Sequence, residues 1–89
     1  MAWTIELSTQ AKKNLKQFDP QTTKRILAFL FERVSMLENP RSIGEALQGT
    51  TLGDCWKYRV GDYRIVAELK DSVLCIVVVR VGHRREVYK

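Results

Sequence analysis

A two-residue turn in the last third of the chain, Gly61-Asp62, constrains the fold more than any other feature of the sequence. Alternating apolar and polar residues flank it on both sides, over 55–60 and 63–69. Glycine suits the first position of a type II′ turn, because it adopts a positive φ at little energetic cost. With these two residues as the loop, Arg59 lies opposite Arg64. The sequence therefore predicts a β-hairpin with a defined register.

The register of this hairpin divides its side chains between two faces, since successive residues of a strand point to opposite sides. The apolar face carries Trp56, Tyr58, Val60, Tyr63, Ile65, Ala67 and Leu69. The other face carries Cys55, Lys57, Arg59, Arg64, Val66 and Glu68. Like charges opposed across strands cost up to about 1 kcal/mol. Two interpretations stay open: the cations extend into water, or they bind a polyanion such as phosphate, to which arginine offers bidentate donors.

The N-terminal half of the chain predicts a strand followed by two helices. Residues 3–7 alternate apolar and polar side chains, as a half-buried strand does. Ser8 is a suitable N-cap for a helix through about Gln17, and Asp19-Pro20 begins a second helix because proline is tolerated at the first helical position. Asn39-Pro40 ends that second helix. Few residues separate the two helices, so we expect them to form a helical hairpin.

The segment after the β-hairpin predicts one more strand. A turn over 70–72 leads to a strongly apolar stretch over 73–81, which is typical of a central strand covered from both sides. Strict alternation assigns Arg80 to the same face of this strand as Leu74, Ile76 and Val78.

Residues 41–54 are the least regular stretch, and a short turn is expected over 45–47. The element order is therefore β-α-α-β-β-β. This order predicts an α+β fold, in which the N-terminal strand and the helical hairpin join a mainly antiparallel sheet. A chain of 89 residues is long enough for one modest core, so we expect a single domain over residues 1–89.

The charge of the chain limits its partners. Fifteen lysines and arginines against ten acids give a net charge of +5, which suits nucleic acid or an acidic protein. No apolar run is long enough for a membrane span, and the first residues lack the pattern of a signal peptide. We therefore expect a cytoplasmic protein with no membrane partner. Cys55 and Cys75 lack metal-ligand spacing and are expected to be buried or half-buried thiols.

The usual catalytic groups are largely missing from the sequence. His83 is the only histidine, the acids are scattered, and no glycine-rich phosphate loop is present. A metal site built on several imidazoles is therefore excluded, and no cofactor is expected. A cationic cluster with Tyr88 and His83 remains, and RNA cleavage needs little more, because the substrate supplies its own 2′-OH nucleophile. In such a site arginines stabilise charge, and a lysine can act as base if neighbouring cations lower its pKa.

Three stretches of the sequence resemble a known family. They are CWKYRVGDYRIVAEL with its G-x-Y-R at 61–64, the L-x-G at 47–49, and the terminal VGHRREVY at 81–88. Together with the element order, they resemble the RelE branch of the RelE/ParE toxin superfamily over nearly the whole chain. The resemblance implies a RelE-like fold and a ribosome-dependent endonuclease, a toxin that cuts mRNA in the A site without a metal.

The resemblance also implies a catalytic set of Lys57, Arg64, Arg84 and Tyr88. Lys57 matches the position of the general base. Arg64 and Arg84 match residues that stabilise the phosphorane, and Arg84 is also placed to assist the leaving group. Tyr88 matches an aromatic residue that stacks on or orients a base, and Arg59 matches a cation that holds backbone phosphate.

Further cations are expected to contact RNA beside Arg59, namely Lys12, Lys13, Lys16 and His83. The three lysines lie on the outward side of the first predicted helix, where a solvated surface is the alternative interpretation. His83 could carry a proton because imidazole titrates near neutral pH, and packing at a strand end is the alternative.

The implied partners are a RelB-like antitoxin, the 70S ribosome with its mRNA, and operator DNA only through the antitoxin complex. Two other functions remain open. A ParE-like DNA gyrase inhibitor would have the same fold without nuclease activity, although the presence of Arg64, Arg84 and Tyr88 together favours the nuclease. A non-toxic nucleic-acid-binding module would bind with a steep salt dependence and cut nothing.

Overall fold

The computed structural model describes residues 2–46 and 55–83, which form a mixed α+β fold. The strands are β1 (Thr4–Leu7), β2 (Glu45–Ala46), β3 (Cys55–Val60), β4 (Tyr63–Lys70) and β5 (Cys75–His83). The helices are α1 (Thr9–Gln17) and α2 (Pro20–Ala28). Short helical turns are η1 (Phe29–Arg33), η2 (Val34–Met36), η3 (Pro40–Ser42) and η4 (Asp71–Val73). The expected α+β class is confirmed.

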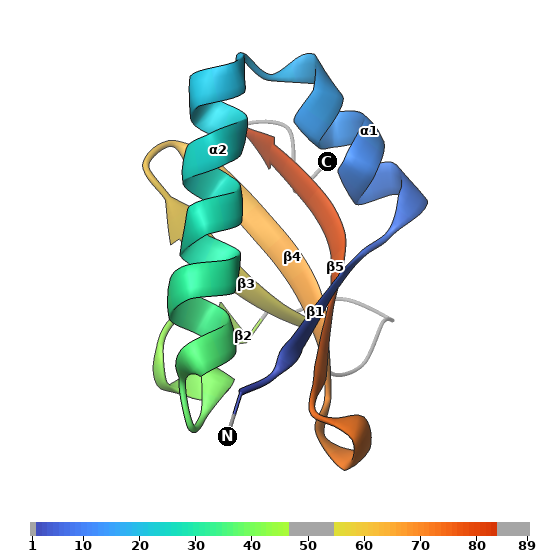
Figure 1. Ribbon diagram of the computed structural model, residues 1–89, viewed down its shortest axis with the longest axis vertical. Helices are drawn as coiled ribbons and strands as arrows, with labels where there is room; N and C mark the ends of the chain where they lie inside the picture. The colour runs from blue at the N-terminus through green and yellow to red at the C-terminus, as the bar shows by residue number, and fades with distance from the viewer. Residues whose placement is uncertain (1, 47–54, 84–89) are drawn as a thin grey trace.

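The five strands form one sheet in the order β1-β5-β4-β3-β2. Only β1 and β5 are parallel, and the other neighbours are antiparallel. Both helices lie on the same side of the sheet, with α1 near β5 and α2 running across the layer (Figure 1). The strand β5 lies inside the sheet between β1 and β4, as its apolar sequence predicts, but the two helices cover only one of its faces instead of both.

The β-hairpin of β3 and β4 has the predicted register. Arg59 pairs with Arg64 across the strands, and Val60 pairs with Tyr63. Gly61 has a φ of +58°, in the left-handed region that glycine adopts without strain. The apolar face of the hairpin turns toward the helices, where Tyr58 and Ile65 are fully buried.

The helices begin where the caps predict. The Ser8 hydroxyl accepts a hydrogen bond from the backbone N–H of Ala11 at 3.0 Å, and the Asp19 carboxylate accepts one from Thr22 at 3.1 Å. After α2 the chain continues without interruption through the π-helical turn η1 and the 3₁₀ turn η2. The buried residues that this helical run packs on the sheet are Ile26, Leu30 and Val34. Within the described ranges, no helix is both long and apolar enough to span a bilayer.

Alternation wrongly assigns Arg80 to the core face of β5. Arg80 pairs with Val66, whereas Val78 pairs with Ala67, so Val79 is the extra residue of a β-bulge. The bulge is stabilised by α1: the Ser8 hydroxyl donates to the Val79 carbonyl at 2.7 Å. Because one additional residue reverses the alternation, Arg80 lies on the face opposite the helices and is exposed.

Two boundaries also differ from the sequence-based expectation. The segment around Glu45 is the strand β2 rather than a turn, because it pairs with β3. The last strand begins at Cys75 rather than at Val73, since the helical turn η4 is followed by Leu74 with a φ of +49°. Cys75 and Cys55 are buried free thiols, as expected.

Candidate nucleic-acid interface

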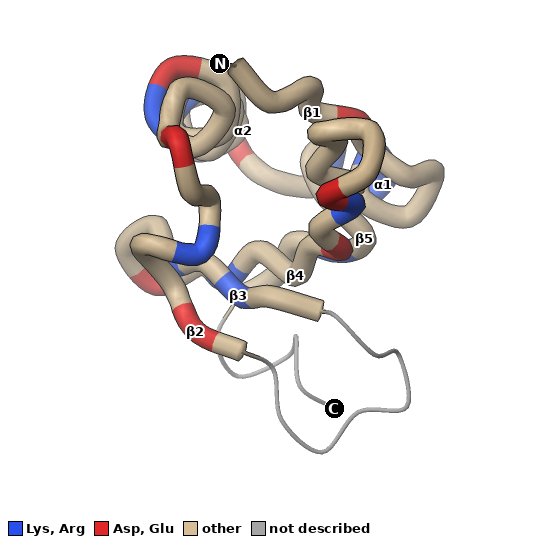
Figure 2. The backbone as a smooth tube through the Cα atoms, turned by 90° about the horizontal axis from the view of Figure 1, so that it is seen from below, with Lys and Arg blue, Asp and Glu red and all other residues tan. Residues whose placement is uncertain are grey.

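The face of the sheet that points away from the helices is cationic. Lys57 and Arg59 of β3, Arg64 of β4 and Arg80 of β5 all lie on it, and we call it the basic face. The register explains the grouping, since Arg64 pairs with Arg59 on one side and with Gly82, which has no side chain, on the other. Figure 2 shows the basic positions of β3 beside the acidic position of β2, the strand at one edge of the sheet.

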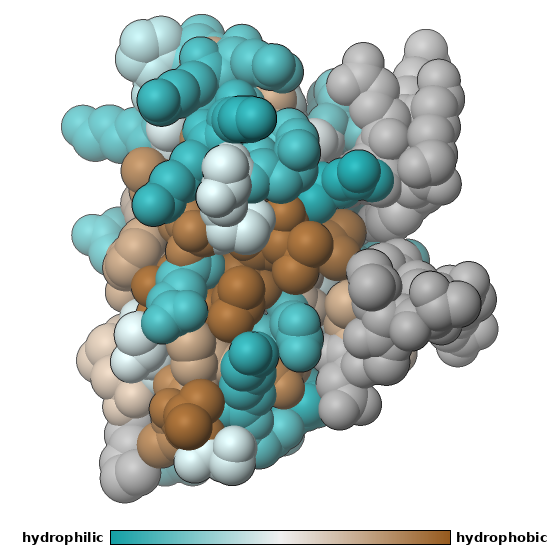
Figure 3. Space-filling model, turned by 90° about the vertical axis from the view of Figure 1, so that its right-hand side faces the viewer, coloured by the Kyte–Doolittle hydropathy of each residue, from teal (hydrophilic) through white to brown (hydrophobic). Residues whose placement is uncertain are grey.

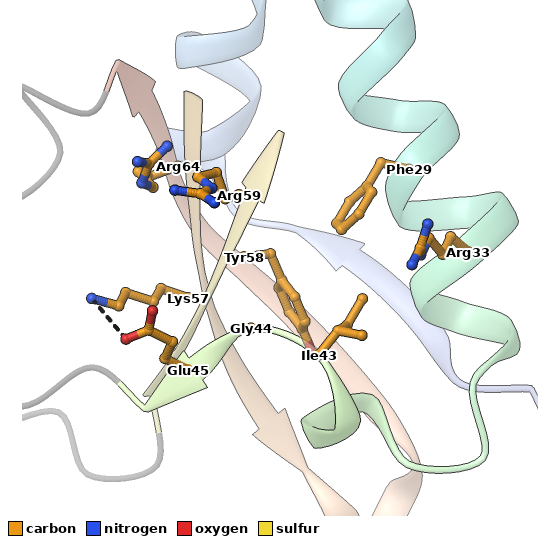
Figure 4. Close-up of a pocket in the computed structure, with 9 residues that line it drawn as sticks. All are labelled: Phe29, Arg33, Ile43, Gly44, Glu45, Lys57, Tyr58, Arg59 and Arg64. Carbon is orange, nitrogen blue, oxygen red and sulfur yellow. Dashed lines mark ion pairs between the residues drawn. The ribbon is translucent and has the colours of Figure 1, made fainter. Parts of the chain in front are cut away.

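At the β3 edge, the basic face continues into a recess of about 590 Å³ between the sheet and η1. Its lining residues are Phe29, Arg33, Ile43, Gly44, Glu45, Lys57, Tyr58, Arg59 and Arg64. We call this hollow the basic recess (Figure 4). Four of its nine lining residues are cations, and they come from both layers of the fold, which makes the recess suited to a multiply charged anion.

Hydrogen bonds to backbone carbonyls hold the wall of the basic recess in place. The Trp56 indole Nε1 donates to the Ile43 carbonyl at 2.7 Å, and the Tyr58 hydroxyl donates to the Pro40 carbonyl at 2.6 Å. Burial raises the pKa of Tyr58 to about 12, so its hydroxyl remains a donor at neutral pH. These bonds fix the segment before β2 against β3.

Gly44 allows this close approach. Its φ is +80°, and a Cβ at this position would overlap the Lys57 carbonyl oxygen and lie 2.7 Å from Trp56 Nε1. A side chain is therefore excluded on both conformational and steric grounds. The geometry of the recess thus depends on a glycine at residue 44.

The cations of the basic recess differ in their contacts. Lys57 Nζ lies 3.6 Å from Glu45 Oε2, the residue it pairs with across β2 and β3. Arg64 Nη1 donates to the carbonyls of Gly61 and Tyr63 at 3.3 and 3.2 Å, which tethers the guanidinium near the hairpin turn. Arg59 makes no ion pair or side-chain hydrogen bond with any other described residue. Charge remains available in the recess for an external anion.

The structure does not bring every predicted site residue into this recess. Arg84 and Tyr88 lie outside the described residues. His83 pairs with Tyr63 and packs edge-to-face on its ring, with centroids 5.9 Å apart, so it lies on the helix side of the sheet. The exposed lysines of α1 are also on that side, away from the basic face; they are Lys12, Lys13 and Lys16.

Three charged residues of this surface were missed by sequence reasoning. Arg33 and Glu45 reach the basic recess only through tertiary packing, and no local pattern marks them. Arg80 did carry a signal. A charged residue at a position that alternation assigns to the core indicates a bulge in the strand.

A second hollow lies between α1 and α2 and has a different character. Its volume is about 700 Å³, and its lining residues are Leu15, Phe18, Pro20, Thr23, Lys24, Leu27, Ala28, Phe31 and Glu32. We call it the apolar groove. Phe31 is 48% exposed there, beside the other apolar side chains of the groove. Figure 3 shows apolar side chains gathered in the middle of the face that carries α1 and β1.

Metal-ligating side chains do not gather on this surface. Over residues 2–46 and 55–83, no three of the His, Cys, Asp and Glu side chains lie close enough together to hold a metal ion.

Comparison with known proteins assigns the chain to a family. The family model described as the ParE toxin of the type II toxin-antitoxin system, parDE, matches residues 5–88, nearly the whole chain. The chain belongs to the RelE/ParE toxin superfamily. This toxin is 27% identical to Toxin RelG of Mycobacterium tuberculosis over 89 residues, which covers 100% of this chain and 99% of that protein.

Solved structures agree with this assignment. The toxin is similar to a chain of the toxin-antitoxin complex RelBE2 from Mycobacterium tuberculosis, with a TM-score of 0.83, 26% identity, and coverage of 97% of this chain and 95% of that one. A chain of the intact RelBE complex of E. coli has the same fold, with a TM-score of 0.73, 24% identity, and coverage of 92% and 96%. The resemblance to RelE toxins and the fold that it implies are confirmed.

Proposed function

We propose that this toxin of a type II toxin-antitoxin system is a ribosome-dependent mRNA endonuclease that cuts in the A site. The observation that supports this function most strongly is the basic recess, where Lys57, Arg59 and Arg64 line one hollow. Preorganised cations stabilise the charge that develops on a phosphate during cleavage, without reorganising at the moment of reaction. The RNA itself provides the nucleophile.

In the proposed reaction, the 2′-oxygen forms a bond to phosphorus while the bond from phosphorus to the 5′-oxygen breaks. A 2′,3′-cyclic phosphate and a 5′-hydroxyl result, and the proton lost from the 2′-OH is balanced by one gained at the leaving oxygen. Arg64 and Arg59 bind the non-bridging oxygens of the phosphorane. Arg84 and Tyr88 complete the proposed catalytic set, with Arg84 beside the leaving group and Tyr88 against a base.

The contact of Lys57 with Glu45 refines the role of the proposed base. An ion pair joins a protonated amine to a carboxylate, and a protonated amine has no lone pair with which to accept a proton. Lys57 can therefore accept the proton of the 2′-OH only when it is not held in this ion pair, in which Nζ lies 3.6 Å from Glu45 Oε2. We infer that Lys57 leaves its contact with Glu45 before it acts as the base.

We further propose a RelB-like antitoxin as the partner of this toxin, because the similar structures from Mycobacterium tuberculosis and E. coli are toxin-antitoxin complexes. An amphipathic antitoxin helix would place its apolar residues in the apolar groove, where Phe31 is exposed. Operator DNA would bind only through the complex. Because the proposed activity requires ribosomes and mRNA, we also propose that the toxin acts in the cytoplasm.

A gyrase inhibitor is the second candidate function, and one observation favours it: the matching family model is that of a ParE toxin. Such a protein would need no phosphate chemistry in the basic recess. Purified gyrase and a supercoiling assay distinguish the two functions, since the nuclease leaves supercoiling unchanged.

The decisive experiment adds the purified toxin to a reconstituted translation reaction and maps breaks in the mRNA by primer extension. We expect breaks at A-site codons that depend on ribosomes, and their loss in the triple variant Lys57→Ala, Arg64→Ala, Arg84→Ala. Intact mRNA with folded toxin, together with inhibited gyrase, would establish the second function instead.

A further inference from the structure

One cation of the basic recess has no place in the proposed chemistry. Arg33 lies at the end of η1, in the helical layer, and lines the recess from the side opposite the sheet. It is exposed, and it makes no ion pair or side-chain hydrogen bond with any residue in the described part of the chain. An uncompensated guanidinium at the edge of an anion-binding hollow is available to bind a ligand.

An aromatic ring accompanies this arginine. Phe29 lies one turn before Arg33 on η1, is half-buried, and lines the same recess. Figure 4 shows both side chains directed from the helix toward β3, with the Phe29 ring above the guanidinium of Arg33. The ring also contacts Tyr58 edge-to-face, with centroids 6.1 Å apart, so its orientation is fixed. The recess therefore offers a flat apolar surface beside a cation.

Phe29 and Arg33 are four residues apart on η1, a spacing that makes side chains neighbours on a helix surface, and η1 is a π-helical turn. Its hydrogen bonds include one from the backbone N–H of Val34 to the Phe29 carbonyl, five residues earlier. A π-turn widens the helix and changes the directions of its side chains, and such turns occur frequently at functional sites. Here the turn ends at Arg33, opposite the cationic strand β3.

We propose that the basic recess is a nucleotide-binding subsite, in which Arg33 binds a phosphate of the RNA next to the scissile one and Phe29 supports the adjoining base. This inference rests on the proposed nuclease function and adds to it a residue outside the catalytic set. A volume of about 590 Å³ lies within the range of pockets that hold small ligands. Unstacked bases of single-stranded RNA bind to aromatic side chains and to arginine planes.

The chemistry of the recess favours RNA over an acidic protein segment. A carboxylate side chain would use the cations but not the ring of Phe29, whereas a nucleotide uses both. The carboxylate of Glu45 also lines the recess and would repel an acidic peptide, but it can accept hydrogen bonds from an exocyclic amine of a base.

The test compares Arg33→Ala with Lys24→Ala in the full chain. Both residues are exposed cations on the same helical run, but Lys24 lines the apolar groove instead of the basic recess. Cleavage of ribosome-bound mRNA is the first readout. The second is the affinity for a fluorescent single-stranded RNA of eight nucleotides, measured by anisotropy at several salt concentrations.

We expect Arg33→Ala to lower kcat/KM about tenfold, as the loss of a charge-assisted contact does. It should also reduce the salt-dependence slope of RNA binding by about 0.7, the value for one phosphate contact on a single strand. Arg33→Lys should retain the slope. Lys24→Ala should change neither quantity.

Each outcome decides the inference separately from the proposed function. If the wild-type toxin cleaves mRNA and Arg33→Ala equals Lys24→Ala in both readouts, the subsite is refuted and the nuclease stands. If the wild type does not cleave, the nuclease is refuted, and a weaker RNA affinity of Arg33→Ala still supports the subsite. The subsite is refuted if Arg33→Ala leaves the RNA affinity unchanged, or if the wild type shows no measurable RNA affinity. Binding of poly-glutamate is measured in the same way. If Arg33→Ala weakens the binding of poly-glutamate but not of RNA, the subsite is also refuted, because the ligand would then be an acidic protein.

Discussion

The two hollows of this toxin share one helical run and differ in almost everything else. Phe29 and Arg33 of η1 line the basic recess, while Leu27 and Phe31 line the apolar groove on the other side of the same run. Hydrogen bonds from side chains to backbone carbonyls hold the wall of the basic recess, which four cations line, whereas mainly hydrophobic side chains between two helices line the apolar groove. The first suits a polyanion and the second a partner protein, so substitutions should affect the two functions separately.

The largest effect is expected at Arg64. Its replacement by alanine removes a tethered donor from the basic recess, and loss of one such donor lowers kcat about 10²–10³-fold. Primer extension on ribosome-bound mRNA measures the change. Lys70→Ala, on the same strand but outside the recess, is the matched control and should cleave at the wild-type rate. Equal rates for the two variants would show that the recess is not the site of chemistry.

The apolar groove should show the opposite behaviour. Phe31→Ser removes its most exposed aromatic ring, and a buried aromatic anchor contributes about 2 kcal/mol or more to an interface. We therefore expect the Kd for the antitoxin, measured by titration calorimetry, to rise about 30-fold while mRNA cleavage stays unchanged. An unaltered Kd would place the antitoxin elsewhere on the surface.

Gly44→Ala sharpens the comparison by disturbing the wall of one hollow only. The added Cβ is forced into a left-handed conformation and overlaps the Lys57 carbonyl, which costs about 1–3 kcal/mol. Urea unfolding measures the loss of stability. Ala46→Gly removes a Cβ from the same strand region and serves as a control. Folded Gly44→Ala should bind the antitoxin with the wild-type affinity, because the apolar groove is unchanged.

The smallest effect is expected at Arg80, which the β-bulge places on the basic face next to the recess. An exposed cation that contacts only backbone phosphate contributes modestly, so Arg80→Ala should lower cleavage about threefold. A salt titration of RNA binding checks the cause, since the slope should decrease. No change in slope would mean that the bound RNA does not extend to β5.

The parts of the fold that are set by local chemistry were predictable from the sequence. Gly61-Asp62 fixed the hairpin register because a two-residue loop leaves one pairing, and Ser8 and Asp19 marked the helix starts because capping acts within one turn. The positions of Lys57 and Arg64 on one face followed directly from that register.

The remainder depends on contacts between residues distant in sequence. Arg33 meets β3 only because the helical run packs across the sheet, and Glu45 meets Lys57 only because β2 pairs at the edge. Arg80 was misplaced because the bulge at Val79 depends on a hydrogen bond from Ser8, which is 71 residues away. Alternation marks Arg80 as a charged residue on a core face, but it contains no information about the contacts of Arg33 and Glu45.

The most direct test of this account places both hollows in one experiment. Ribosome-bound mRNA is treated with wild-type toxin, Arg64→Ala or Phe31→Ser, each with and without its antitoxin, and breaks are mapped by primer extension. We predict that Arg64→Ala leaves the mRNA intact yet still binds the antitoxin, and that Phe31→Ser cuts the mRNA in the antitoxin's presence. Cleavage by Arg64→Ala at the wild-type rate would contradict the assignment of RNA chemistry to the basic recess.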